Sequence, residues 1–127
     1  MEHNEQAYVV TWAAILQSRY PELELLYAIP NGAKLPYIGK GKRRFSPQAR
    51  VLKQEGLLPG IPDLCLPIGK NGKNALYIEM KFGKNKPSPE QEDIIAKLRL
   101  YNNQVDICYS GEEAVNVIKK YLDIYDT

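Results

Sequence analysis

The chain has 127 residues and a formal net charge of +2; 44% of the residues are hydrophobic and 25% are charged. This length suits one domain, residues 1–127, and the composition is that of an ordinary globular protein. No apolar run approaches the length of a membrane span, and the N-terminus carries no signal-peptide pattern. We therefore expect a cytoplasmic protein that does not contact membranes.

The N-terminal third is predicted to hold one helix and one strand. Residues 5–19 form an amphipathic pattern in which Val9, Trp12 and Leu16 recur at helical spacing. Glu5 continues this apolar stripe one turn earlier, a position that the helix dipole alone could explain. A strand is predicted over residues 23–29, and Pro30-Asn31-Gly32 turns the chain out of it.

A basic segment follows, with no acidic residue between Glu24 and Glu55. Ser46 is predicted to cap a short helix that starts at Pro47 and ends near Gly56. On composition alone, the segment is either a solvated surface or a surface for the phosphate backbone of nucleic acid. Its cations are Lys34, Lys40, Lys42, Arg43, Arg44, Arg50 and Lys53.

The centre of the chain is predicted to be a β-hairpin. Two apolar runs, residues 64–66 and 76–81, flank Asn71-Gly72, a dipeptide typical of tight hairpin turns. Cys65 in the first run and Cys108 near the C-terminus lack metal-ligand spacing, so we expect both to be reduced core thiols.

Folding the hairpin about Asn71 brings Asp63 opposite Glu79 or within one residue of it. Cross-strand partners have Cβ atoms about 5 Å apart, so the two carboxylates would repel unless a cation lay between them. Lys81 lies two residues beyond Glu79 on the same strand face. Two acids and a lysine at this spacing suit a hard-cation site that cleaves phosphodiesters. A solvated strand face is the structural alternative.

The C-terminal third is predicted to form helix, strand and helix. Ser88-Pro89-Glu90-Gln91 has the form of a capping box, and Gln91 shares a helix face with Ile95 and Leu98. Gln91 therefore either only caps the helix or also faces the strand that carries Lys81. A strand over residues 105–109 and a helix over 112–122 complete an α/β order of α-β-α-β-β-α-β-α, with a right-handed crossover after the hairpin.

Several of these motifs together resemble a known family. Pro62-Asp63 followed by Glu79-Met80-Lys81 resembles the PD-(D/E)xK nuclease signature. Three further motifs resemble one branch of this superfamily, the virus-type replication-repair nuclease (VRR-NUC) domain. They are Pro30-Asn31-Gly32, the stretch from Gly56 through Gly60-Ile61-Pro62-Asp63-Leu64, and Ser88-Pro89-Glu90-Gln91. The resemblance implies a restriction-endonuclease-like mixed sheet flanked by helices.

The resemblance also implies Mg²⁺- or Mn²⁺-dependent hydrolysis of DNA. Asp63, Glu79 and the Met80 carbonyl would bind the metal, and Lys81 would orient or deprotonate the attacking water. Glu5 matches a metal-binding glutamate of the family, with Glu2 as the alternative, and Gln91 matches a glutamine near the active site. DNA contacts are expected from Asn31, Lys40, Lys42, Arg43, Arg44, Arg50 and Lys53.

Stand-alone short members of this family, of phage or bacterial type, act as homodimers on Holliday junctions in DNA repair. The resemblance thus implies a homodimer that resolves four-way junctions by two symmetric nicks. The motifs leave open a flap or nicked-duplex nuclease, a restriction-type nuclease, and a DNA-binding module without turnover.

Overall fold

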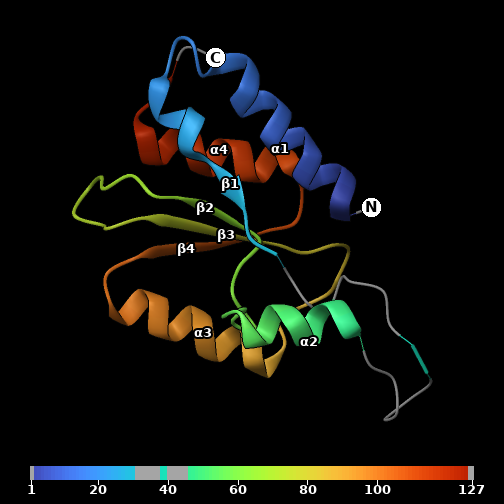
Figure 1. The fold of residues 1–127 in the computed structure, drawn as a ribbon. Coiled ribbons are helices and arrows are strands. Elements are labelled where there is room, and N and C mark those ends of the chain that lie inside the picture. Colours follow the sequence, from blue (N-terminus) through green and yellow to red (C-terminus); the bar gives the residue numbers. More distant parts are fainter. Residues whose placement is uncertain (1, 31–37, 40–45, 126–127) are drawn as a thin grey trace.

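A mixed β-sheet lies between two layers of helices (Figure 1). The computed structural model describes residues 2–30, 38–39 and 46–125. Within them, the strands are β1 (Tyr27–Ala28), β2 (Leu64–Leu66), β3 (Leu76–Met80) and β4 (Gln104–Cys108), in the order β1-β2-β3-β4. The helices are α1 (Glu2–Leu16), the 3-10 helix η1 (Pro21–Leu25), α2 (Pro47–Gln54), α3 (Pro89–Leu100) and α4 (Gly111–Leu122).

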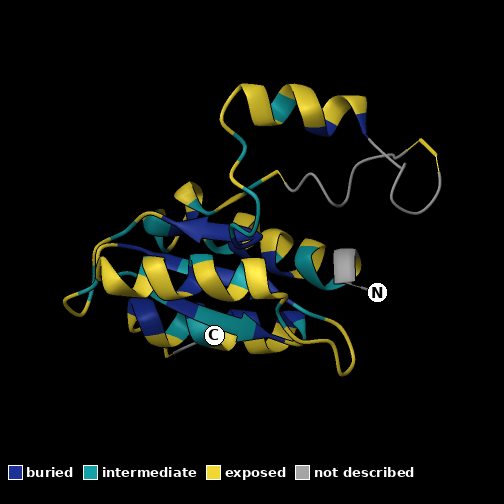
Figure 2. Ribbon diagram, turned by 90° about the horizontal axis from the view of Figure 1, so that it is seen from below, coloured by how far each residue is buried: buried dark blue, intermediate teal, exposed yellow. Residues whose placement is uncertain are grey.

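The strand pairings confirm the predicted topology. β1–β2 and β2–β3 are antiparallel, and β3–β4 is parallel through the α3 crossover. α1 and α4 cover one face of the sheet, while α3 and α2 lie on the other side (Figure 1). In Figure 2, α3 crosses the sheet with its outer side exposed, and α2 lies at the margin of the domain. This is the α/β arrangement expected for a restriction-endonuclease-like fold.

The main hydrophobic core lies between the sheet and the α1–α4 layer. Leu64 and Leu66 of β2 and Ile78 of β3 are at most 1% exposed and pack with apolar residues of both helices. These residues share one face because strand side chains alternate with a period of two. Cys65 and Cys108 are buried free thiols, as expected.

Local turn and cap signals explain most element boundaries. Asn71 and Gly72 have positive φ angles of 54° and 78°, as a two-residue hairpin turn requires, and Lys70 and Lys73 exchange backbone hydrogen bonds across it. Ser46 Oγ accepts a hydrogen bond from Ala49 N, which confirms the predicted helix start at Pro47. No helix within the described ranges is long and apolar enough to span a membrane.

The strand predicted over residues 23–29 was wrong in its first half. Residues 21–25 instead form η1, and only Tyr27–Ala28 pair with β2. Pro21 occupies the first helical position, where its fixed φ favours a helical turn, and that turn buries Leu23 in the core. The alternation of Leu and Glu in this segment resembled a strand, but only Leu23 and Leu26, three residues apart, pack in or against the core, and Leu25 is exposed. This spacing is that of a 3-10 turn.

Candidate active site

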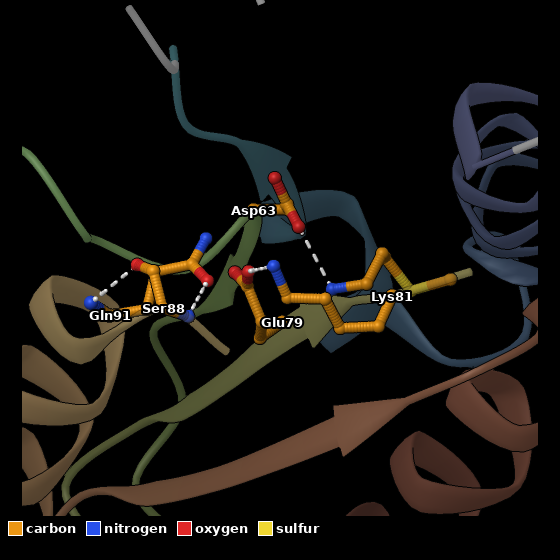
Figure 3. A network of polar contacts seen from close by, with 6 residues as sticks. Asp63, Glu79, Lys81, Ser88 and Gln91 are labelled. Carbon is orange, nitrogen blue, oxygen red and sulfur yellow. Dashed lines mark hydrogen bonds and ion pairs between the residues drawn. The ribbon is translucent and has the colours of Figure 1, made fainter. Parts of the chain in front are cut away.

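The β2–β3 hairpin brings Asp63 and Glu79 together. Leu64 pairs with Ile78, so the next step of the same register places Asp63 opposite Glu79. Asp63 Oδ2 accepts a hydrogen bond of 2.8 Å from the Met80 amide, so its carboxylate reaches across to the end of β3 (Figure 3). Both acids are buried, at 3% and 1% exposure. The predicted acid pair is therefore present, and it is buried rather than solvated.

Lys81 completes the cluster from the end of β3. Its Nζ lies 3.2 Å from Glu79 Oε2, and the side chain is only 14% exposed. Its backbone amide donates to the Cys108 carbonyl at 2.8 Å, which continues the β3–β4 pairing past the last assigned strand residue. The sheet therefore holds the lysine backbone in place and fixes its side chain on the face that carries Glu79 (Figure 3).

The environment of Glu79 opposes its ionised form. Burial, followed by the charge of Asp63, raises the pKa of Glu79 from 4.5 to about 7, and the neighbouring Lys81 only partly offsets this. Glu79 Oε1 is buried and makes no hydrogen bond to any residue within the described ranges. A buried carboxylate oxygen without a partner is costly.

A hard divalent cation fits this arrangement. It would supply the missing partner of Glu79 Oε1 and offset the repulsion between the two carboxylates. No group of three or more Asp, Glu, His or Cys side chains that could hold a metal occurs in the described part of the chain. Mg²⁺ and Mn²⁺ accept such a sparse protein donor set, because carbonyls, waters and substrate phosphate oxygens can fill the other positions.

The structure places Glu5 at a different contact. Its Oε1 accepts a hydrogen bond of 2.7 Å from the Gly111 amide at the start of α4, where the helix dipole favours a negative charge. The approach is close: a Cβ on Gly111 would lie 2.8 Å from the Glu5 carbonyl oxygen and 2.6 Å from the Tyr8 ring. The structure therefore does not gather Glu5 with Asp63 and Glu79 into a three-carboxylate group. The side chain of Glu2 lies outside the described part of the structure.

Gln91 forms the predicted capping box. Ser88 Oγ accepts from the Gln91 amide at 3.2 Å, and Gln91 Oε1 accepts from the Ser88 amide at 2.9 Å. In Figure 3 the Gln91 side chain extends from this cap toward Glu79. The capping role is confirmed, and its role in catalysis stays a prediction.

The predicted DNA-contacting residues divide into two groups. Arg50 and Lys53 are exposed on α2, as expected. The others, Asn31, Lys40, Lys42, Arg43 and Arg44, lie outside the described residues.

Sequence reasoning missed two supports of Asp63. The Asp63 carbonyl accepts from the Ile29 amide at 2.8 Å, which ties the acid to the end of β1. Gly60, with φ of 88°, approaches α3 so closely that a Cβ would lie 2.7 Å from the Glu90 carbonyl oxygen. The glycine in Gly60-Ile61-Pro62-Asp63 was a usable signal for a close backbone approach, but its partner could not be read from the sequence.

Comparisons with known proteins agree with this geometry. Residues 4–112 match the VRR-NUC domain. A solved structure described as a VRR_NUC domain protein has the same fold, with a TM-score of 0.73 and 22% sequence identity over 98% of this chain and 90% of that chain. No curated protein matches the chain. The family match covers most of the chain and includes the acid pair and the lysine, so the chain belongs to the VRR-NUC domain family of nucleases.

Proposed function

We propose that this domain is a metal-dependent endonuclease that hydrolyses phosphodiester bonds of branched DNA. The observation that carries the proposal is the buried pair of Asp63 and Glu79. Glu79 Oε1 has no hydrogen-bond partner among the described residues, and Lys81 Nζ lies 3.2 Å from Oε2. Such a cluster is unfavourable as a purely structural element, since it buries two like charges. It is favourable when a divalent cation binds.

Each residue of the cluster has a distinct task. Asp63 and Glu79, with the Met80 carbonyl, would hold Mg²⁺ or Mn²⁺. The bound ion supplies Lewis acidity to the scissile phosphate and to an attacking water. Lys81 Nζ, already placed beside Glu79, orients or deprotonates that water and offsets negative charge that develops in the transition state. The Met80 amide keeps Asp63 directed across the hairpin.

Glu5 and Gln91 are proposed as auxiliary residues. Glu5 Oε1 is engaged by Gly111, so a metal contact would use its other oxygen, Oε2. Glu5→Gln keeps an acceptor for Gly111 but loses the charge, so loss of cleavage without loss of stability would support a metal role. Gln91 Oε1 caps α3, which leaves its amide nitrogen as the group that could reach a ligand between Gln91 and Glu79.

The DNA backbone is proposed to lie along the basic segment. Arg50 and Lys53 on α2, together with Asn31, Lys40, Lys42, Arg43 and Arg44, would contact phosphates. Neutralising a contacting residue should reduce the slope of log affinity against log salt by about 0.9 on duplex DNA. An unchanged slope would assign the segment to a solvated surface.

Junction resolution is the finer proposal. A four-way junction has two-fold symmetry, and a homodimer would present two equivalent acid pairs related by the same operator. Each copy would cut one strand, so the dimer would introduce paired symmetric nicks. The alternatives are a flap or nicked-duplex nuclease, a restriction-type nuclease, and a DNA-binding module without turnover.

One experiment separates these alternatives. The protein is incubated with a four-way junction, a flap, a nicked duplex and an intact duplex, each with Mg²⁺, Mn²⁺ or EDTA. We expect metal-dependent cleavage that is fastest on the junction, with paired cuts, and a dimer by sedimentation. A monomer that makes single cuts would favour the flap nuclease, and binding without cleavage in either metal would favour the silent module.

A further inference from the structure

A groove of about 370 Å³ opens beside the acid pair, on the sheet face opposite the main core. Tyr27 of β1 and Tyr77 of β3 line the sheet side of it. Its other walls come from α2 and the segment that follows, through Leu52, Leu57, Leu58 and Ile61. Tyr27 is 50% exposed and Leu58 is 49% exposed, so two large apolar groups of the groove are open to a ligand.

Tyr27 and Tyr77 together form the floor of the groove on its sheet side, and we call them the tyrosine floor. Each pairs across the sheet with Cys65 of β2, Tyr27 from one side and Tyr77 from the other. Hydrogen bonding with the Cys65 thiol is the main cause that raises the pKa of Tyr27 to about 12; burial and then Cys65 raise the pKa of Tyr77. Tyr27 is half exposed and lines the groove, so its ring is accessible to a planar ligand there.

The groove adjoins the backbone that carries Asp63. Ile29 lines the groove, and its amide donates to the Asp63 carbonyl at 2.8 Å. Ile61, on the opposite wall, precedes Asp63 by two residues. A planar group seated on the tyrosine floor would thus lie next to the backbone segment that positions Asp63.

The charges around the groove suit a nucleotide. Arg50 and Lys53 are exposed on α2, the helix that forms one wall, and can contact phosphates outside the groove. Glu55 lies at the same wall, where its carboxylate can accept a hydrogen bond from an exocyclic amino group of a base.

We propose that the groove holds one unpaired nucleobase of the DNA, stacked on Tyr27, while its flanking phosphodiester approaches Asp63 and Glu79. This inference rests on the proposed hydrolysis of DNA. A flat aromatic surface between apolar walls is what base stacking uses in proteins that bind single-stranded nucleic acid. A base within an intact duplex would first have to unstack, so the groove selects DNA whose bases are already unpaired.

A protein partner fits the groove less well than a base. The groove adjoins Asp63, so a second copy of the chain seated in it would obstruct the approach of DNA to the acid pair. The base instead enters with the substrate and places the adjoining phosphate near the catalytic residues.

The test measures DNA binding without cleavage. All variants carry Asp63→Asn and are assayed in EDTA, with a duplex that contains one unpaired 2-aminopurine and with the same duplex containing an abasic residue at that position. We expect quenching of the 2-aminopurine fluorescence on binding and about tenfold weaker affinity for the abasic DNA. Tyr27→Ala should abolish both differences, whereas Tyr27→Phe, which keeps the ring, should retain them.

A matched control uses a tyrosine on the other side of the sheet. Tyr125 is 82% exposed just after α4, so Tyr125→Ala should change neither quenching nor affinity. Circular dichroism melting checks that the Tyr27 variants fold; this edge-strand residue is half exposed, so its truncation should leave the core intact.

Equal affinity for the base-bearing and abasic DNAs would overturn the proposal. The proposal would also be overturned if Tyr27→Ala dissociated a dimer and the unsubstituted protein bound both DNAs equally. The groove would then be a protein interface. Cleavage of DNA by the protein with Asp63 intact is scored separately, so a failed groove leaves the nuclease assignment standing, and loss of turnover leaves the binding test interpretable.

Discussion

The two faces of the β2–β3 hairpin differ in what they bury. On the α1–α4 face, Leu64, Ile78 and Met80 are fully buried among other apolar side chains. On the opposite face, the next residues along the same strands are Asp63 and Glu79, which are almost equally buried but ionisable. Burial on the first face stabilises the folded state. Burial of two acids and a lysine on the opposite face lowers that stability and holds the three side chains in a fixed arrangement.

This difference depends on the register of one hairpin. Because the side-chain period of a strand is two, a slip by one residue would move Glu79 into the core and Ile78 to the active face. The Asn71-Gly72 turn pairs Lys70 with Lys73, whereas the strands pair Leu66 with Leu76, so the segments between the turn and the strands absorb a shift of one residue. The resulting register places the core residues and the acid pair on opposite faces, and substitutions on the two faces should have separable effects.

The largest expected effect comes from Asp63→Asn. This change keeps the volume of the side chain but removes a proposed anionic metal ligand. The cleavage rate should fall by more than ~10²-fold, because mutating a residue that only hydrogen-bonds to a metal ligand already lowers activity by up to about that factor. DNA affinity in EDTA should change little. Single-turnover cleavage and a binding titration on the same DNA provide the two measurements, and normal turnover by this variant would refute the assignment of the acid pair.

The second effect concerns the core face. Ile78→Ala removes a buried side chain one residue from Glu79 and should lower the free energy of unfolding by about 2–5 kcal/mol. Urea denaturation measures this loss, with Ile78→Val, expected to cost about 0.5–1.5 kcal/mol, as the matched smaller deletion. Cleavage per folded molecule at low temperature should remain close to that of the parent, and a proportional loss of turnover would show that the faces are not separable.

The third effect is a pH dependence of stability. The pKa of Glu79 is raised from 4.5 to about 7, so the folded protein retains a proton that the unfolded chain releases in this interval. The free energy of unfolding in EDTA should therefore decrease as pH rises through this window and stay lower above it, by about 1–3 kcal/mol.

Comparison with Glu79→Gln isolates this contribution, because the variant lacks the carboxyl group that titrates in this window. The variant should match the parent near pH 4.5 and be more stable above pH 7 in EDTA, where the parent has lost stability. Mg²⁺ should restore stability to the parent but not to the variant. A stability difference that is independent of pH would contradict the proposed ionisation of Glu79.

The smallest effect concerns Gln91, at the margin of the active face. Gln91→Ala removes the acceptor for the Ser88 amide and should cost about 1 kcal/mol of stability or less. Gln91→Glu preserves a capping box and should preserve stability. If Gln91 also serves the active site through its amide nitrogen, both variants should reduce cleavage; if it only caps, Gln91→Glu should cleave normally.

The sequence was most informative where structure depends on near neighbours. The turn at Asn71-Gly72 and the caps at Ser46 and Ser88 were predictable because each depends on residues within a few positions. The placement of Asp63 against Glu79 was predicted to within one residue from the turn and the strand period.

Contacts between distant segments were beyond that reasoning. The Glu5–Gly111 hydrogen bond joins residues 106 positions apart, and the approach of Gly60 to Glu90 joins a loop to a helix. The tyrosine floor needed the β1–β2 register, which was obscured because residues 21–25 form a 3-10 helix where a strand was predicted. Neither propensity nor periodicity carries this information, since tertiary packing decides it.

The hydrogen bond from the Met80 amide to Asp63 Oδ2 also makes this backbone proton a spectroscopic reporter. Most amides of a central strand exchange with solvent only when the sheet opens, since their acceptors are backbone carbonyls. The acceptor of the Met80 amide is instead the carboxylate of Asp63, a proposed metal ligand, so the chemical shift and exchange rate of this amide should respond to whatever Asp63 binds. The chain thus carries, in one peptide group, a probe of active-site occupancy that requires no label at the acid pair itself.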